Sequence, residues 1–139
     1  MELNFFTEDT KMPDINKDIL SVWIQKVIEN NNFSAGNINI IFCSDEYLLK
    51  TNQEFLGHDY YTDIITFNYC DDKVISGDIF ISLCRVNENA EKFNTTDTEL
   101  LRVIIHGILH LVGFNDKSEE EKQNMRNLED MALTLYNTI

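Results

Sequence analysis

The chain has 139 residues, a length that suits one domain with a single hydrophobic core. Hydrophobic residues make up 43% of it, so it can bury a sizeable core and is not expected to be disordered. Its 24 acidic residues outnumber 11 basic ones, and the net charge of −13 weighs against broad, non-specific binding to polyanions.

The first residues carry neither a basic region nor an apolar run, so we expect no signal peptide. No apolar run approaches the roughly 20 residues that a membrane helix needs. The three cysteines are widely spaced and form no CxxC pair, which fits buried thiols in a reducing compartment. We therefore expect one soluble, cytoplasmic domain over residues 1–139, with no membrane partner; the oligomeric state stays open.

Hydrophobic periodicity and turn residues divide the chain into alternating strands and helices. Residues 2–6 are extended, and apolar residues at spacings of three and four predict a helix over 15–30. β-Branched residues bounded by turns predict strands at 38–43, 63–69 and 78–82. Further helices are expected from Ser44 or Asp45 to Gly57, over 85–93, over 99–113 and from Ser118 onward.

These elements predict an α/β (α+β) fold: one small mixed sheet of about four strands, packed by about five helices. Asp97 or Thr98 is expected to cap the strongly apolar helix over 99–113. Ser118 and Glu121 have the spacing of a capping box for the last helix.

Two of the three histidines, His106 and His110, lie four residues apart in the apolar helix over 99–113. At this spacing both imidazoles point to the same face, with Cβ atoms about 5–6 Å apart, and can bind one metal ion. Gly113 then lets the chain turn back, so that Asp116 can supply a third ligand. The alternative is that both rings only pack in the core. However, buried rings need polar partners, and one ion at the end of this central helix satisfies both.

The identity of the ion is less constrained than its ligands. Asn115 is a weaker candidate ligand than Asp116, because a neutral amide oxygen binds zinc poorly. The metalloprotease motif HExxH shares the histidine spacing, but Gly107 occupies the position of its glutamate. Two histidines and a carboxylate could also hold non-haem iron, although no cosubstrate signature accompanies them. We expect one divalent metal ion, with zinc as the default.

The segment HGILHLVGFND (106–116) resembles the signature of the YbeY-type rRNA maturation endoribonucleases, a metal-dependent hydrolase family whose pattern is His-Gly-x-Leu-His-Leu-x-Gly-aromatic-Asp-His. TDIITF (62–67) resembles the family's Thr-Asp-Val-Leu-Ser-Phe, and GDIFIS (77–82) resembles its Gly-Asp-Ile strand. The segments keep the family's order, and the resemblance covers nearly the whole chain. It implies an endoribonuclease that hydrolyses phosphodiester bonds of an rRNA precursor in ribosome biogenesis, with the ribosome or its factors as further partners.

The chain departs from the family pattern at two positions. Asp116 stands where the family has a third histidine, which lowers the charge of the site by one and makes a metal-bound water less acidic. Leu56, in NQEFLG (52–57), stands where the family usually has an arginine. A cationic phosphate anchor is therefore missing there, and His58 and Arg85 are the candidates to replace it.

His58 and Arg102 are the candidate catalytic residues outside the metal ligands. His58 lies in a polar loop before a strand, a common place for catalysis, and its alternative role is a solvated turn. Arg102 lies one turn before His106, where it can face a phosphate or pair with Glu99. Structural roles are favoured for five neighbouring polar residues: Asp59, Thr62, Asp63, Thr66 and Asp78.

Three functions from different classes are open. The first is the metal-dependent endoribonuclease. The second is a hydrolase of another bond, such as a peptidase, which requires a glutamate such as Glu99 to reach the metal-bound water. The third is a non-catalytic, ribosome-associated factor in which a metal ion only stabilises the turn after the helix. Leu56, in place of the family's arginine, favours this function.

Overall fold

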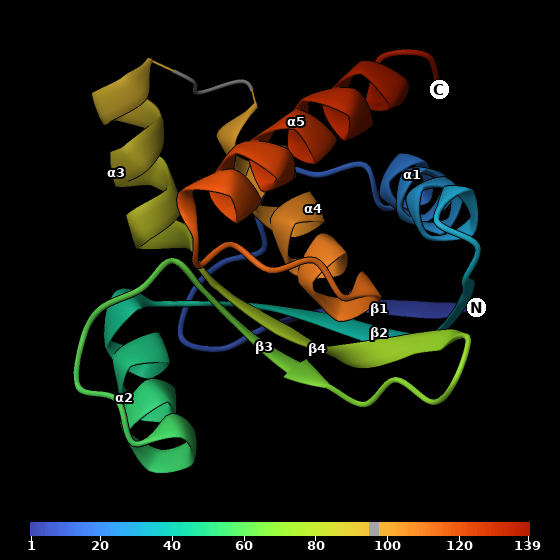
Figure 1. Ribbon diagram of the computed structural model, residues 1–139. Coiled ribbons are helices and arrows are strands. Elements are labelled where there is room, and N and C mark those ends of the chain that lie inside the picture. Colours follow the sequence, from blue (N-terminus) through green and yellow to red (C-terminus); the bar gives the residue numbers. More distant parts are fainter. Residues whose placement is uncertain (95–97) are drawn as a thin grey trace.

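The computed structural model describes residues 1–94 and 98–139 (Figure 1). Within these residues no helix is both long and apolar enough to span a membrane. The elements in chain order are β1 (Glu2–Thr7), α1 (Lys17–Asn30), β2 (Ser34–Cys43), α2 (Asp45–Leu56), β3 (Ile64–Asn68), β4 (Val74–Ser82), α3 (Leu83–Phe93), α4 (Glu99–Val112) and α5 (Glu119–Tyr136).

The strands form one mixed sheet in the order β1-β2-β4-β3. β1 and β4 run parallel to β2, and β3 pairs antiparallel with β4. The predicted fold class is confirmed. β2 and β4 begin four residues earlier than the sequence predicts, because Ser34 pairs with Val74 and the ladder continues past an irregularity after Ala35. The added residues of β2 include Gly36 and do not alternate between apolar and polar side chains, so periodicity does not predict them. They are extended because they pair with the added residues of β4.

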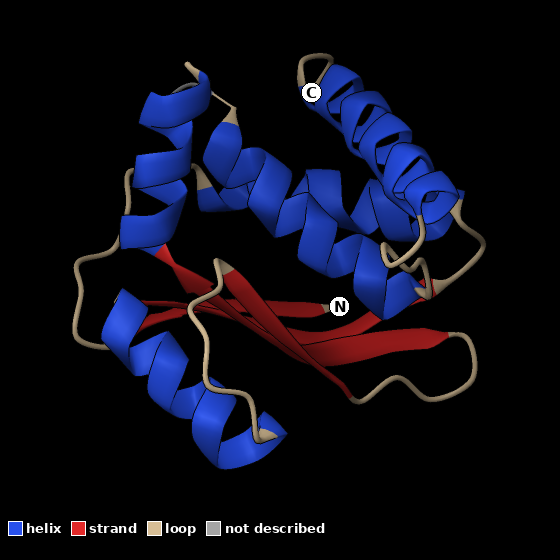
Figure 2. Cartoon of the chain, turned by 60° about the vertical axis from the view of Figure 1, so that its left-hand side comes forward, coloured by secondary structure: helices blue, strands red, loops and turns tan. Residues whose placement is uncertain are grey.

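Helices α1, α3, α4 and α5 cover one face of the sheet, and α2 lies on the other (Figures 1 and 2). The main core lies between the sheet and the larger helical layer. A smaller cluster of Cys43, Leu48 and Ile65 lies between α2, which contributes Leu48, and the sheet. Members of the main core with almost no exposed surface include Trp23, Ile28, Ile40, Phe42, Ile79, Ile81, Ile104 and Ile108.

Helix α4 lies close against the sheet because Gly107 has no side chain. A Cβ atom at this position would lie 2.8 Å from Ile64 Cδ1 and 3.0 Å from Ile79 Cγ2. The glycine therefore serves helix–sheet packing. With Gly107 turned to the sheet, the neighbouring His106 and His110 are only half-buried along the side of the helix.

Helices α2 and α5 begin at capping residues that the sequence predicts. Ser44 caps α2 through the backbone N–H of Tyr47. Ser118 and Glu121 form the predicted capping box at the start of α5. Of the two residues expected to cap α4, Asp97 lies outside the described residues. Thr98 occupies the N-cap position, but its side chain makes no capping hydrogen bond.

Candidate metal centre

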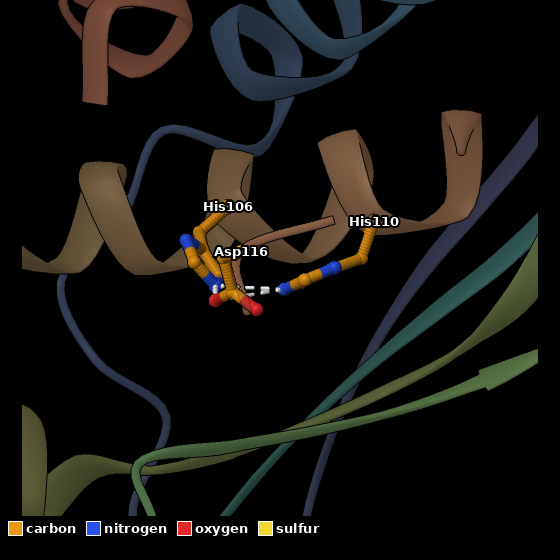
Figure 3. A group of neighbouring side chains, drawn as sticks. All are labelled: His106, His110 and Asp116. Carbon is orange, nitrogen blue, oxygen red and sulfur yellow. Dashed lines mark hydrogen bonds and ion pairs between the residues drawn. The ribbon is translucent and has the colours of Figure 1, made fainter. Parts of the chain in front are cut away.

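The side chains of His106, His110 and Asp116 point toward one another (Figure 3). The Nε2 atoms of the two histidines are 2.9 Å apart, and Asp116 Oδ2 lies 3.2 Å from that of His106 and 3.4 Å from that of His110. Ligands bonded to a tetrahedral zinc ion at about 2.0–2.1 Å are separated by about 3.3 Å. The spacing of this His–His–Asp triad therefore fits one metal ion.

The two histidines come from successive turns of α4, while Asp116 lies in the following loop. Gly113 adopts a φ of 118°, and its N–H bonds to the carbonyl groups of Leu109 and His110. This left-handed turn ends the helix and brings the chain back toward the histidines. The sequence predicts this return, and the structure brings the three predicted ligands together.

The hydrogen bonds at the far side of each ring decide which nitrogen atoms face the triad as acceptors. His110 Nδ1 lies 3.0 Å from the carbonyl oxygen of Phe114, which can only accept a hydrogen bond. His106 Nδ1 lies 2.6 Å from Glu129 Oε2. When both rings are neutral and donate through Nδ1, two Nε2 lone pairs and a carboxylate oxygen converge with no donor between them. A metal ion satisfies all three acceptors at once.

Glu129 is a site residue that sequence reasoning missed. It comes from α5 and is only 6% exposed, and its other oxygen accepts a hydrogen bond from Arg102 Nη1 at 2.9 Å. One signal could have identified it. Glu129 lies four residues after Met125 and three before Ala132, so an acid interrupts the buried stripe of α5. A buried acid in an apolar stripe needs a partner on the opposing helix.

Arg102 lies between α4 and α5. Its Nη2 donates to Asp130 Oδ1 at 2.6 Å, in addition to the bond from Nη1 to Glu129. Burial lowers the pKa of Arg102, but the hydrogen bonds that it donates to Asp130 and Glu129 outweigh this effect, and the pKa is raised. The guanidinium of Arg102 is thus bound by two carboxylates of α5. The sequence suggested a phosphate contact or a pair with Glu99, and it did not predict these two partners.

A cavity of about 280 Å³ adjoins the triad. Its lining contains four acids and one arginine: the residues are Asp63, Glu99, Arg102, Val103, His106, Asp116 and Glu129. Burial raises the pKa of Asp63, while the positive charge of a protonated His106 opposes this rise. Such a concentration of carboxylates favours a divalent cation.

The two candidates to replace the family's arginine have their contacts elsewhere. His58 is exposed, and its ring stacks on Tyr60, whose hydroxyl lies 3.1 Å from Nδ1. Arg85 Nη2 pairs with Asp45 at 2.6 Å, and its guanidinium lies over the ring of Tyr61. The described residues that line the cavity beside the triad include neither side chain.

Three of the remaining polar candidates, Asp59, Thr62 and Asp78, have hydrogen-bond partners away from the triad. Asp59 accepts a hydrogen bond from Gln53, and Thr62 bonds to the carbonyl group of Ile64. Asp78 accepts a bond from Asn39 and lines a different cavity, of about 600 Å³, on the α2 side of the sheet.

The metal-free protein should lose stability as the pH rises. Burial lowers the pKa of His106, but the hydrogen bond and charge of Glu129, with the charges of Asp116 and Asp63, raise it above its usual value. A raised pKa in the folded state stabilises the fold fully below the unfolded value of about 6.5, and this contribution is lost as the pH passes through the folded pKa.

Urea unfolding of chelator-treated protein, from about pH 5.5 to about pH 9, measures this dependence. In that pH range, His106→Gln should reduce the dependence of the free energy of unfolding on pH. The same slope in wild type and in this variant would contradict the assignment.

Comparisons with known proteins agree with this geometry. The family model described as "Endoribonuclease YbeY" matches residues 4–137. An "Endoribonuclease YbeY" of Bacteroides thetaiotaomicron is 50% identical over 136 residues, which cover 97% of this chain and 99% of the relative. The protein of the same name from Phocaeicola vulgatus is 52% identical over 134 residues, covering 96% of this chain and 97% of the relative.

A solved structure shows the same fold. The solution structure of a Thermotoga maritima protein superposes with a TM-score of 0.63 at 26% identity, covering 98% of this chain and 92% of the other. The family match spans nearly the whole chain and includes the helix and the loop that supply the His–His–Asp triad. The chain therefore belongs to the endoribonuclease YbeY family.

Proposed function

We propose that this chain is a metal-dependent endoribonuclease that hydrolyses phosphodiester bonds of an rRNA precursor during rRNA maturation. The convergence of the three ligand atoms of the triad beside an acidic cavity carries this proposal, in a chain of the endoribonuclease YbeY family. Residues 1–139 are proposed to act as one hydrolase domain in the cytoplasm. The ribosome or its factors are proposed as further partners that orient the RNA.

The proposed resident ion is zinc, held by His106, His110 and Asp116. Two neutral imidazoles and one carboxylate are a donor set that suits zinc and leaves a fourth position open. When bound, the ion supplies Lewis acidity to a phosphate group and to water at the site. Asp116 in place of a third histidine adds a negative charge that favours the cation.

The protein's own groups orient the triad and can move protons near it. The carbonyl group of Phe114 holds the ring of His110 through Nδ1. Among the carboxylates that line the cavity, Asp63 and Glu99 lie outside both the triad and the bond to His106, so we propose them as the candidates to accept a proton from the attacking water. Asp63→Asn and Glu99→Gln, assayed side by side, identify which one does so.

The proposed function is tested by cleavage of an rRNA-precursor transcript. Protein purified without chelator should cleave it, chelator treatment should stop cleavage, and added zinc should restore it. The same preparation is offered an unstructured peptide, because Glu99 lines the cavity as a peptidase would require. Peptide hydrolysis without RNA cleavage would support the hydrolase of another bond, and zinc binding without either activity would support the non-catalytic factor.

RNA binding should depend only weakly on salt. Both candidate phosphate anchors, His58 and Arg85, have contacts away from the cavity, and Arg102 is paired with two carboxylates. Each phosphate neutralised on single-stranded RNA contributes about −0.7 to the slope of log K against log salt, so one or two contacts predict a slope no steeper than about −1.4.

Filter binding at several salt concentrations measures this slope. Leu56→Arg restores the family's cation and should steepen the slope by about 0.7. A slope of about −4 or steeper in wild type would show that several basic residues contact phosphate, against this prediction.

A further inference from the structure

Three charged side chains link α5 to the candidate metal ligand His106. Asp130 binds Arg102 Nη2 at 2.6 Å, Arg102 Nη1 binds Glu129 Oε1 at 2.9 Å, and Glu129 Oε2 binds His106 Nδ1 at 2.6 Å. Arg102 and His106 lie one turn apart on α4, and Glu129 and Asp130 are adjacent on α5. The two helices are therefore joined at the triad by a continuous series of charge-assisted hydrogen bonds.

The burial of Glu129 within this series argues against a role in stability alone. Glu129 is 6% exposed in the interface between two helices whose other buried positions are apolar. Removing a carboxylate and a guanidinium from water is costly, and apolar side chains of similar volume often stabilise a fold equally well. Each oxygen of Glu129 accepts one bond, and its two partners are the ring of His106 and the guanidinium of Arg102.

The contact between Glu129 and His106 Nδ1 bears on which ring nitrogen of His106 carries a hydrogen atom. A ring that donates through Nδ1 keeps its lone pair on Nε2, and Nε2 is the atom that faces His110 and Asp116. The opposite tautomer would place a hydrogen atom among the ligand atoms and oppose the ion. Arg102 holds the other oxygen of Glu129, which prevents the carboxylate from turning away from the ring.

We propose that Glu129 and Arg102 are positioning residues that hold His106 in the tautomer and orientation required for metal binding, with Asp130 fixing Arg102. This inference rests on the proposed metal-dependent function and adds residues outside the triad to it. Arg102 then acts through Glu129.

The test replaces the buried pair without leaving a buried charge. The double variant Arg102→Met/Glu129→Leu has apolar side chains of similar size, so its urea midpoint should equal or exceed that of the wild type. Its zinc affinity, measured by competition with a chelating dye, should fall about 10- to 100-fold. Long-range ¹H–¹⁵N spectra of the metal-free proteins, recorded at about pH 9 so that the ring is neutral, should show the Nδ1–H form of His106 in wild type and a mixture of tautomers in the variant.

Two further variants distinguish the positioning of the His106 ring from a general effect of negative charge on α5. Glu129→Gln keeps an acceptor for Nδ1, so it should retain more zinc affinity than the double variant. Glu120→Gln removes an exposed acid from the first turn of α5 and should leave zinc affinity unchanged.

The outcomes distinguish this inference from the proposed function. Zinc affinity in the double variant equal to that of a zinc-binding, RNA-cleaving wild type would overturn the positioning role alone. A wild type that binds no zinc would overturn both. A fold that is less stable while zinc affinity and the tautomer are unchanged would assign the pair a purely structural role.

Discussion

His110→Ala should abolish RNA cleavage while the fold stays intact. The substitution removes one of three converging ligand atoms, so the ion would lose one of its bonds to the protein. A metal ion supplies several kcal/mol of charge stabilisation in the transition state, and each 1.36 kcal/mol corresponds to a tenfold change in rate. We therefore expect the cleavage rate of an rRNA-precursor transcript to fall at least about 1,000-fold.

The matched control is His58→Ala, which removes the one histidine that lies away from the triad. His58 is exposed and contacts Tyr60, so this variant should keep its metal content. Its cleavage rate also tests whether His58 is catalytic. Cleavage by His110→Ala within tenfold of the wild type, at equal metal supply, would show that the reaction does not need this ligand.

Trp23→Ala should cause the largest loss of stability among the substitutions considered. Trp23 is 0% exposed, its indole N–H donates to the carbonyl group of Ala132 at 2.7 Å, and its ring forms a T-shaped pair with the ring of Tyr136. Truncating a buried tryptophan leaves a cavity and here also removes the indole hydrogen bond to Ala132, so the free energy of unfolding should fall by about 3–5 kcal/mol.

The effect should extend to the metal site, because Trp23 fixes α5 three residues after Glu129. Urea unfolding and zinc affinity are measured on the same preparation. Val22→Ala is the control on the same helix: Val22 is 44% exposed, and the change should be within about 0.5 kcal/mol. A loss below about 1 kcal/mol for Trp23→Ala would show that α5 does not depend on this contact.

The sequence predicts the parts of this site that depend on local spacing. His106 and His110 share a helix face because they lie four residues apart, and Gly113 permits the turn that returns Asp116 to them. The sheet-forming and helical segments also follow from periodicity and capping residues. These features depend on neighbouring residues, and for that reason one sequence is sufficient to predict them.

The missed features depend on contacts between distant segments. Glu129 reaches His106 across 23 residues, and Arg102 finds its partners on α5 instead of on its own helix. Gly107 contacts two strands that the helix pattern does not specify. The extra residues of β2 and β4 likewise form strands because they pair with each other. These four features are set by how the helices and strands pack against one another, and hydrophobic periodicity does not encode that packing.

Metal content is the most direct test of the claim that His106, His110 and Asp116 hold one ion. Wild type, His110→Ala and Asp116→Ala are purified without chelator and examined by elemental analysis. We expect about one equivalent of a transition metal, predominantly zinc, in the wild type and almost none in either variant. A wild type that contains no metal and binds none when it is added would contradict the claim, and so would variants that retain a full equivalent.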